Sequence, residues 1–378
     1  MEEIWKASQR LMNEINVLGF QAYIVGGAVR DYLLKRPIAD VDLVTTAAPS
    51  ELLTHFPKSF QLNNQHDTVL IKANNVWFEV TTQNGVSLEE DLKSRDFTIN
   101  SMALSNEREL IDPYHGQKDL ELRQIRSTEP MKSMASDPLR MLRAIRFTAE
   151  LGFELDVHVE EAIAVYVADL QNVAMERIVK EIEKIWRGSH FKEATQTEAA
   201  ATILKNLPLC AFNDEEMSRL HMWDNPIIEN ELFIWSSIFL LKGWSKLTAP
   251  KLPLSKNLIK GVHKRLLAYQ ERYEQRWNVD SLYQFGIEVA LDVEDLRKSF
   301  GFSTISAQQL HEMVNAMAIR SRKDLRIDGR SLMAAYPEKN PGVWIETCLR
   351  IAETLVLHEE VENDAELILA ALKRRECG

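Results

Sequence analysis

The chain has 378 residues, which is long enough for two or more domains at about 150 residues each. Its formal net charge of −11 argues against a protein that coats nucleic acid nonspecifically. The cysteines at 210, 348 and 377 lack the spacing of a zinc site, and we expect them to stay reduced. The sequence shows neither a signal peptide nor a membrane span, so we expect a cytoplasmic protein.

The first predicted elements are a strand over residues 20–25 and a helix over residues 29–34, joined by Gly26 and Gly27. The apolar, partly alternating residues of the first segment suit a strand. Glycine at such a turn lets the backbone approach a ligand closely, and the amide groups that open a helix favour an anion. Arg30 would add a charge-assisted contact to a phosphate.

Two carboxylates follow, Asp40 and Asp42, separated by one residue. In a strand these side chains would share one face, where they could hold a pair of divalent cations. A glycine pair alone is typical of ordinary turns, and two nearby aspartates are common on surfaces. A strand, a glycine turn, a helix and an acidic strand in this order predict the layout of a nucleotidyl-transfer site.

A third carboxylate, Glu79, lies in a strand-like run over residues 76–82, which follows another such run over residues 68–72. Glu79 would complete the acidic group if its strand lies beside the acidic strand. The alternative is a surface glutamate on an edge strand, and the sequence leaves both open. Up to about residue 120 strand-like and helical runs alternate, whereas helical periodicity dominates the remainder.

An acidic and a basic residue, Asp137 and Arg140, stand three apart at a helix predicted over residues 139–151, and Arg143 and Arg146 continue the series. A carboxylate accepts from the exocyclic amine of cytosine and an arginine donates to the acceptors beside it, so the pair matches the Watson–Crick edge of cytosine. The alternative is a helix N-terminus in which Asp137 is a cap and Arg140 is solvated. The residues alone favour the cap.

Two segments are basic, residues 123–146 with a net charge of +4 and residues 251–276 with a net charge of +5. Tyr269 and Tyr273 are interleaved with the second. Basic charge with aromatic side chains suits an RNA backbone and its unstacked end. A solvated amphipathic helix is the alternative for the second segment. A further helix is predicted over residues 157–170.

The motifs become more specific along the chain. Residues 95–100 read Arg-Asp-Phe-Thr-Ile-Asn, residues 112–120 read Asp-Pro-Tyr-His-Gly-Gln-Lys-Asp-Leu, and residues 137–140 read Asp-Pro-Leu-Arg. Together with the glycine turn and the two aspartates, this succession resembles the class II tRNA nucleotidyltransferases and the related bacterial poly(A) polymerases. The resemblance runs through nearly the whole chain and is most specific between residues 22 and 150.

The resemblance implies an α+β fold. A nucleotidyltransferase head of the polymerase-β-like kind, built on a mixed sheet, would precede an all-helical neck, body and tail. We place the catalytic head at residues 1–120, the neck with a nucleotide-template helix at 121–200, the body at 201–310 and a tRNA-binding tail at 311–378.

The resemblance also implies the chemistry. Asp40 and Asp42 would hold Mg²⁺ and, with Glu79, catalyse the attack of an RNA 3′-hydroxyl on the α-phosphorus of a nucleoside triphosphate. Pyrophosphate would be released.

Roles in nucleotide binding follow from the same resemblance. Arg95 would contact the triphosphate or sugar, and Asp96 and Asn100 would organise the site or recognise ribose. Asp137 and Arg140 would act as a protein template for the base. The full set of expected nucleotide-binding residues is Gly26, Gly27, Arg30, Arg95, Asp96, Asn100, Asp137, Arg140, Arg143 and Arg146.

One departure from the family pattern bears on the product. Only residues 83–87 join Thr82 to the helical run that begins at Leu88, whereas enzymes that complete the whole CCA end usually carry a much longer, charged, flexible loop there. That loop is thought to move the templating side chains when the site switches from cytosine to adenine. At roughly 3.3 Å per residue, five residues span little more than a tight hairpin. We therefore expect a CC-adding enzyme that uses tRNA and CTP and leaves the terminal adenosine to a separate A-adding partner.

Three alternatives stay open. A full CCA-adding enzyme would use ATP as well as CTP. A poly(A) polymerase would prefer ATP and tends to carry a basic C-terminal extension, whereas this chain is acidic over residues 359–364 before its last basic residues. The presence of both Asp40 and Asp42 speaks against a noncatalytic RNA-binding module with a degenerate head.

Overall fold

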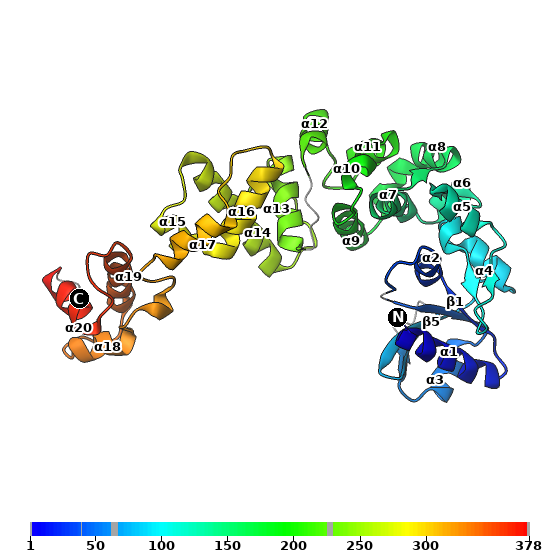
Figure 1. Cartoon of the computed structure of the whole chain (residues 1–378), viewed down its shortest axis with the longest axis horizontal. Coiled ribbons are helices and arrows are strands. Elements are labelled where there is room, and N and C mark those ends of the chain that lie inside the picture. Colours follow the sequence, from blue (N-terminus) through cyan, green and yellow to red (C-terminus); the bar gives the residue numbers. More distant parts are fainter. Residues whose placement is uncertain (1, 39, 62–66, 225–229, 376–378) are drawn as a thin grey trace. The chain divides into compact units, whose positions relative to one another are not determined.

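The computed structural model describes residues 2–38, 40–61, 67–224 and 230–375. The chain divides into two compact units, residues 1–213 and 214–378 (Figure 1). The first contains a mixed sheet with helices, and the described part of the second is helical, which confirms the predicted α+β fold class. Within the described residues, no helix is both long enough and apolar enough to span a bilayer.

The first unit begins with a sheet and its accompanying helices. These elements are α1 (Glu2–Val17), β1 (Ala22–Val25), α2 (Gly27–Leu33), β2 (Asp42–Thr45), α3 (Pro49–His55), β3 (Ser59–Gln61), β4 (Thr68–Ala73), β5 (Val76–Thr82), α4 (Leu88–Ser94), β6 (Ala103–Leu104) and β7 (Leu110–Ile111). The sheet has the strand order β3-β4-β5-β2-β1-β6-β7. β2 and β5 pair in parallel, and the other neighbours pair antiparallel. The strands predicted over residues 20–25, 68–72 and 76–82 are confirmed to within two residues.

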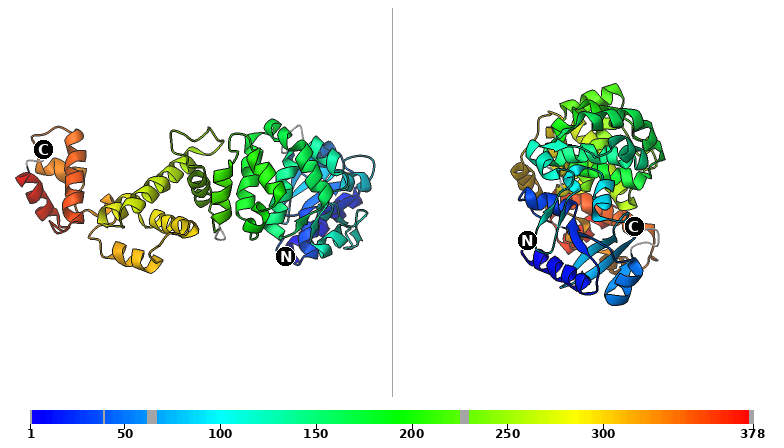
Figure 2. Two further views of the ribbon diagram at one scale, coloured as in Figure 1. Left: turned by 90° about the horizontal axis from the view of Figure 1, so that it is seen from above. Right: turned by 90° about the vertical axis from the view of Figure 1, so that its right-hand side faces the viewer.

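The two faces of this sheet differ, because successive side chains of a strand point to opposite sides. Val69 of β4 and its partner Val80 of β5 are buried on one face. Helices α1 and α3 contact β4, and α1 also contacts β5, so these helices cover that face (Figures 1 and 2). Asp42 and Glu79, both exposed, lie on the opposite face.

The rest of the first unit surrounds one buried helix. Its elements are α5 (Gly116–Leu122), β8 (Gln124–Ile125), α6 (Pro130–Ser136), α7 (Leu139–Leu151), β9 (Glu154–Leu155), α8 (Val157–Tyr166), α9 (Met175–Trp186), α10 (Phe191–Thr195) and α11 (Glu198–Lys205). α7 coincides with the predicted helix, and it packs against α9 and α10. β8 and β9 form a parallel pair of two residues each, so the neck is not all-helical as predicted.

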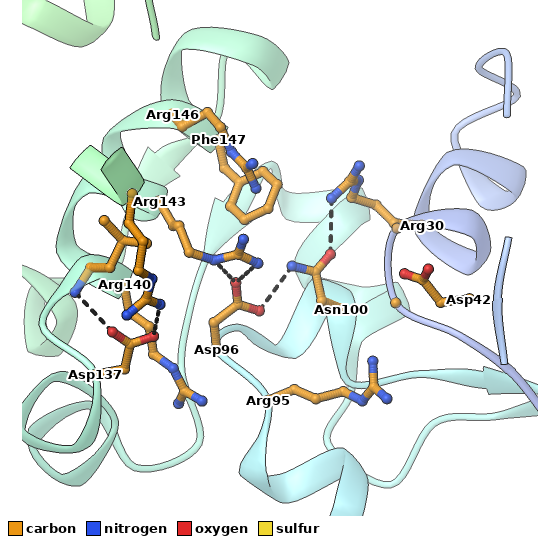
Figure 3. Close-up of a pocket in the computed structure, with 14 residues that line it drawn as sticks. Arg30, Asp42, Arg95, Asp96, Asn100, Asp137, Arg140, Arg143, Arg146 and Phe147 are labelled. Carbon is orange, nitrogen blue, oxygen red and sulfur yellow. Dashed lines mark hydrogen bonds and ion pairs between the residues drawn. The ribbon is translucent and has the colours of Figure 1, made fainter. Parts of the chain in front are cut away.

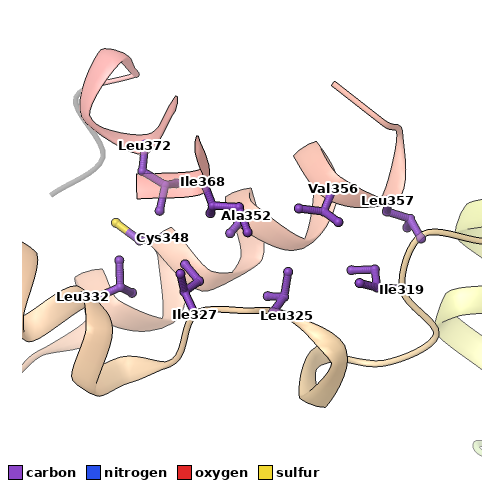
Figure 4. Packing of buried hydrophobic residues seen from close by; sticks show 10 residues of the cluster. All are labelled: Ile319, Leu325, Ile327, Leu332, Cys348, Ala352, Val356, Leu357, Ile368 and Leu372. Atoms are coloured by element: carbon purple, nitrogen blue, oxygen red, sulfur yellow. The ribbon is translucent and has the colours of Figure 1, made fainter. Parts of the chain in front are cut away.

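The described residues of the second unit include two apolar cores. Its helices are α12 (Asp214–Met222), α13 (Glu231–Lys242), α14 (Lys256–Glu274), α15 (Val279–Phe285), α16 (Ile287–Ser299), α17 (Ala307–Asn315), α18 (Gly329–Ala335), α19 (Val343–Leu357) and α20 (Ala365–Arg374). One core lies among α14 to α17 around Leu282 and Val293. The other lies among α18 to α20 around Leu332 and Ile368 (Figure 4). The borders at residues 120, 200 and 310 stay predictions.

Cys348 belongs to this second core, where it is buried. Cys377 lies outside the described residues.

Hydrogen bonds to a buried carboxylate join the two cores of the second unit. Glu353 of α19 accepts from Nε and Nη2 of Arg322, both at 2.8 Å, and from the hydroxyl of Tyr283 of α15 at 2.7 Å. The bonds from Arg322 lower the pKa of Glu353, although burial alone would raise it. Burial and the bond to Glu353 together raise the pKa of Tyr283 well above its usual range. α15 and α19 are therefore linked through ionised Glu353.

Candidate active site

A pocket of about 460 Å³ lies between the β1–α2 turn, the start of α7 and α9 (Figure 3). It brings together eleven of the thirteen predicted site residues; Asp40 and Glu79 are outside its lining. Three further residues line it that the sequence did not indicate. The lining consists of Gly26, Gly27, Arg30, Asp42, Arg95, Asp96, Asn100, Asp137, Leu139, Arg140, Arg143, Arg146, Phe147 and Arg177.

The glycine turn keeps one side of the pocket open. Gly26 has a φ of +70°, in the left-handed region that favours glycine. A Cβ atom at this position would lie 3.2 Å from Nη1 of Arg95 and 3.8 Å from Oδ2 of Asp42. A larger residue would therefore crowd the space between these two side chains.

Arg30 is held rigidly at the wall of the pocket. Its side chain comes from α2, and its Nη1 donates to Oδ1 of Asn100 at 2.9 Å. Nε and Nη2 donate to the carboxylate of Asp31 at 3.1 and 3.0 Å. The guanidinium also lies 5.0 Å from the centroid of the Phe147 ring, a cation–π distance. The sheet domain and α7 thus fix this charge together.

Asp96 organises the centre of the site. Its Oδ2 accepts from Nε of Arg143 at 2.7 Å and from Nη2 of the same guanidinium, while Oδ1 accepts from Nδ2 of Asn100 at 3.0 Å (Figure 3). Burial alone would raise the pKa of Asp96, but Arg143 and the hydrogen bonds hold it below its usual range. Burial opposes the charge on Arg143, yet Asp96 raises the pKa of that guanidinium. The pair is therefore ionised at neutral pH.

Asp137 is held by two donors at the start of α7. Its Oδ1 accepts from the amide of Leu139 at 3.2 Å, as a helix-capping carboxylate does. Its Oδ2 accepts from Nη2 of Arg177, on α9, at 2.8 Å. The N-cap position of α7 is Pro138 and not Asp137 as predicted, but the Asp137 carboxylate still binds the first amide of the helix. The same carboxylate also lines the pocket. The two interpretations of Asp137 are compatible.

Arg140 bridges α7 to α6 and α4 rather than pointing freely into solvent. Its Nη1 donates to Oγ of Ser133 on α6 at 2.8 Å. Its Nη2 donates to the main-chain carbonyl of Ser94, the last residue of α4, at 2.8 Å. The alternative in which Arg140 is solvated is therefore wrong.

Three guanidinium groups surround the buried ring of Phe147. Those of Arg30, Arg143 and Arg146 lie 5.0, 5.6 and 4.3 Å from its centroid. Nε of Arg146 lies 3.4 Å from Oε2 of Glu181 on α9. Burial lowers the pKa of Arg146 more than Glu181 raises it. An anion in the pocket would relieve this concentration of positive charge.

Two of the three predicted catalytic carboxylates, Asp42 and Glu79, lie on neighbouring strands of the sheet, and Asp42 also lines the pocket. Asp42 opens β2 and pairs with Val25 of β1 on one side and Glu79 of β5 on the other. β5 lies between β4 and β2, so Glu79 is not on an edge strand. Asp40 was expected in the strand with Asp42, but β2 begins at Asp42, and Asp40 is exposed just before it.

The chemistry of these donors fits a divalent cation. Desolvation of its carboxylate beside the pocket raises the pKa of Asp42, the negative charge of Glu79 raises it further, Arg95 lowers it and Asp40 raises it. A divalent cation bound by such carboxylates would offset the repulsion between their negative charges and favour their ionised form. In the parts of the chain that the structure describes, no group of three or more His, Cys, Asp or Glu side chains is arranged closely enough to be a metal centre. Asp42 is the member of the set that reaches the pocket.

Positive charge outweighs negative charge in the lining, which contains six arginines and three aspartates. This excess suits a triphosphate. Arg177 and Phe147 could not be found from local motifs, because Arg177 is an ordinary polar position of an amphipathic helix and Phe147 an ordinary apolar one. Packing of α7 against α9 makes them part of the site.

The five-residue connection after β5 is short and fixed. The amide of Asn84 donates to Oδ1 of Asp91 at 2.9 Å, and the amide of Val86 donates to Oε2 of Glu90 at 2.8 Å. Oδ2 of the same Asp91 accepts from Nε and Nη2 of Arg95 at 3.1 and 3.0 Å. One carboxylate thus ties the connection to a side chain of the pocket.

Three families match successive parts of the chain. Residues 22–87 and 82–126 match the Poly A polymerase head domain. Residues 152–208 match the probable RNA and SrmB-binding site of polymerase A. Residues 229–372 match the putative tRNA nucleotidyltransferase domain 2. The two pieces of the head match overlap in the short connection after β5.

Relatives match along nearly their whole length. The CC-adding tRNA nucleotidyltransferase of Shouchella clausii is 37% identical, and that of Halalkalibacterium halodurans 36%, with 99% of each chain covered in both comparisons. The structure of the Bacillus stearothermophilus CCA-adding enzyme in complex with CTP matches with a TM-score of 0.86 at 31% identity, covering 98% of this chain and 97% of that one. The chain therefore belongs to the class II tRNA nucleotidyltransferases, the enzyme superfamily of CCA-adding enzymes and bacterial poly(A) polymerases.

Proposed function

We propose that this enzyme adds two cytidines from CTP to the 3′ end of tRNA and leaves the terminal adenosine to a separate enzyme. The observation that carries the proposal is the connection after β5, whose amides are bound by Asp91 and Glu90. A switch from cytosine to adenine requires the templating side chains to move. A connection that is this short and this firmly hydrogen-bonded could not change shape enough to move them. The two CC-adding relatives support the same product. Its substrates would be tRNA and CTP, in the cytoplasm.

Base selection would come from Asp137 and Arg140. The carboxylate would accept from the exocyclic amine of cytosine, and the guanidinium would donate to the acceptors beside it. Arg177 holds the first and the carbonyl of Ser94 holds the second. Because both are fixed, a purine, whose edge lies farther from its sugar, would not fit the same space.

Transfer would proceed by direct displacement. Arg30, Arg95 and Arg143 would bind the triphosphate of CTP. The 3′-hydroxyl oxygen of the tRNA forms a bond to the α-phosphorus while the bond from that phosphorus to the bridging oxygen of pyrophosphate breaks, and the hydroxyl proton passes to solvent. Mg²⁺, held by Asp42 with Asp40 and Glu79, would lower the pKa of the hydroxyl and neutralise phosphate charge. The arginines compensate the charge on the leaving pyrophosphate.

The tRNA itself would be bound mainly by the helical second unit, and we assign residues 311–378 to a tRNA-binding tail.

The full CCA-adding enzyme stays the alternative, because the Bacillus stearothermophilus enzyme matches almost the whole chain. The two functions differ only in the last nucleotide added.

The test offers the purified enzyme a tRNA that ends at the discriminator base, with CTP alone, ATP alone or both, and sequences the products. Products that end in CC when both nucleotides are present support the proposal. CCA ends would establish the full activity, long A tails a poly(A) polymerase, and unextended tRNA a noncatalytic RNA-binding protein. The Bacillus stearothermophilus CCA-adding enzyme, run on the same tRNA, is the control for a substrate that can be completed.

A further inference from the structure

An exposed pair of aromatic rings lies on the sheet, outside the pocket lining. Phe60 of β3 and Trp77 of β5 are 48% and 47% exposed, and their ring centroids are 5.4 Å apart at an interplanar angle of 69°. Nζ of Lys72, on β4 between them, lies 5.6 Å from the centroid of the Trp77 ring. We call Phe60, Lys72 and Trp77 the aromatic platform. Large rings that are exposed side by side mark a binding surface.

Strand register places the platform on the face that carries the catalytic carboxylates. Asp42 pairs with Glu79, Glu79 with Leu70, and Leu70 with Phe60. These four side chains therefore form one row across β2, β5, β4 and β3, which spans about 14 Å at about 4.8 Å between strands. Trp77 lies two residues before Glu79 in β5 and so shares this face.

The surroundings of the platform are basic. A hollow of about 540 Å³ beside it is lined by Lys58, Lys72, Asn74 and Asn75. Helices α1 and α3 cover the opposite face of the sheet (Figure 1). A surface of exposed rings and lysines is complementary to a chain of stacked bases and phosphates, because every base offers a π-face and every phosphate a negative charge.

We propose that the aromatic platform binds the unpaired 3′ end of the RNA substrate, with bases stacked on Phe60 and Trp77 and phosphates beside Lys58 and Lys72. The last hydroxyl of the RNA must reach the pocket at Asp42, and the nucleotides before it must follow a continuous surface. The row from Asp42 to Phe60 is such a surface. The inference rests on the proposed function, because it takes tRNA as the substrate. It adds the location of the growing 3′ end of the tRNA on the enzyme.

The experiment measures binding of the full-length enzyme to three forms of one tRNA in the absence of nucleotide. The first lacks the discriminator base and is blunt, the second ends at the discriminator, and the third ends in CC. Phe60→Ala/Trp77→Ala is compared with the wild type and with Leu53→Ala, which changes an exposed apolar residue of α3 beyond the opposite face. We expect the double variant to bind the CC-ended tRNA about tenfold more weakly. Its affinity for the blunt tRNA and the behaviour of Leu53→Ala should match the wild type.

Two further single variants identify the kind of contact. Trp77→Phe keeps an aromatic ring and should keep most of the affinity for the CC end, whereas Trp77→Leu keeps apolar area without a π-face and should lose it. Equal affinity of the leucine and phenylalanine variants for the CC-ended tRNA would show that no base stacks on Trp77 and would overturn the inference. Unchanged binding of the double variant, or an equal loss on all three tRNAs, would also overturn it.

This result does not depend on the product of the reaction. A wild type that completes CCA ends would change the proposed function and leave the platform standing. If the wild type binds none of the three tRNAs, both the proposed function and the role of the aromatic platform are wrong.

Discussion

Nη2 of Arg177 donates to Oδ2 of Asp137 at 2.8 Å, which joins a side chain of α9 to a residue two positions before α7. Oδ1 of the same carboxylate already accepts from the amide of Leu139. Both oxygens of the carboxylate that we propose to read the base are therefore held by donors of the protein itself. Arg177 thereby fixes the orientation of the Asp137 carboxylate.

Replacement of Arg177 by alanine should weaken base selection more than folding. The Arg177 side chain is 52% exposed, and an ion pair of this exposure contributes at most about 1 kcal/mol to stability. We expect the ratio of kcat/KM for CTP to that for ATP to fall about fivefold, while the free energy of unfolding changes by less than about 1 kcal/mol. Lys180→Ala, at an exposed position of the same helix outside the pocket lining, is the control. Equal selectivity of the two variants would contradict this role of Arg177.

Replacement of Asp42 by asparagine should abolish turnover without loss of stability. The substitution removes the carboxylate that reaches the pocket, so we expect kcat to fall at least about a hundredfold. It also removes repulsion from Glu79, which helps to raise the pKa of Asp42, so the free energy of unfolding should stay the same or increase. Single-turnover kinetics with CTP and urea unfolding check the two parts. A variant that keeps its turnover would remove Asp42 from the mechanism.

Asp96→Asn should change how stability depends on pH. The pKa of Asp96 is lowered in the folded state, so its contribution is complete above the unfolded value of about 3.9 and is lost as the pH falls through the folded pKa. Breaking a buried ion pair costs about 3–5 kcal/mol, and because the Arg143 side chain is 31% exposed we expect about 2 kcal/mol at neutral pH. Urea unfolding from pH 6 to pH 3 should show the wild type approaching the variant below about pH 4. A constant difference over this range would show that the charge of Asp96 is not the cause.

Glu353→Gln should loosen the link between α15 and α19. Glutamine cannot form the paired, charge-assisted bonds that Glu353 makes with Arg322, and we expect a loss of about 2 kcal/mol in the free energy of unfolding. Glu346→Gln removes another bond to the same arginine, at an exposed position, and should have a smaller effect. Thermal unfolding of both variants measures the difference. Equal effects would indicate that burial of Glu353 is unimportant.

Much of the fold was predictable because its signals are local. The alternation of β4 and β5 and the helical period of α7 belong to consecutive residues, and the structure confirms these elements. β8 and β9, with two residues each, are too short to show a period. Asp40 was placed in a strand because of its spacing from Asp42, but spacing alone does not determine where a strand begins.

The residues of the site that lie in short sequence motifs were predictable, but the contacts between them were not. Asp96 and Arg143 were both expected at the nucleotide, yet their ion pair joins residues 47 positions apart and follows only from the packing of α7 on the sheet domain. Arg177 contacts Asp137 from 40 positions away for the same kind of reason. A single sequence does not predict such a pair, because the residues next to each partner carry no signal of the other partner's position.

The group that holds Arg140 from α4 is the carbonyl of Ser94, and every amino acid has a carbonyl at the same place. The identity of the side chain at position 94 is therefore irrelevant to this contact, and a scan of substitutions there would not reveal it. What matters is the path of the main chain at the end of α4. The contact between α4 and α7 therefore depends on the path of the main chain and leaves no signature in the amino-acid sequence.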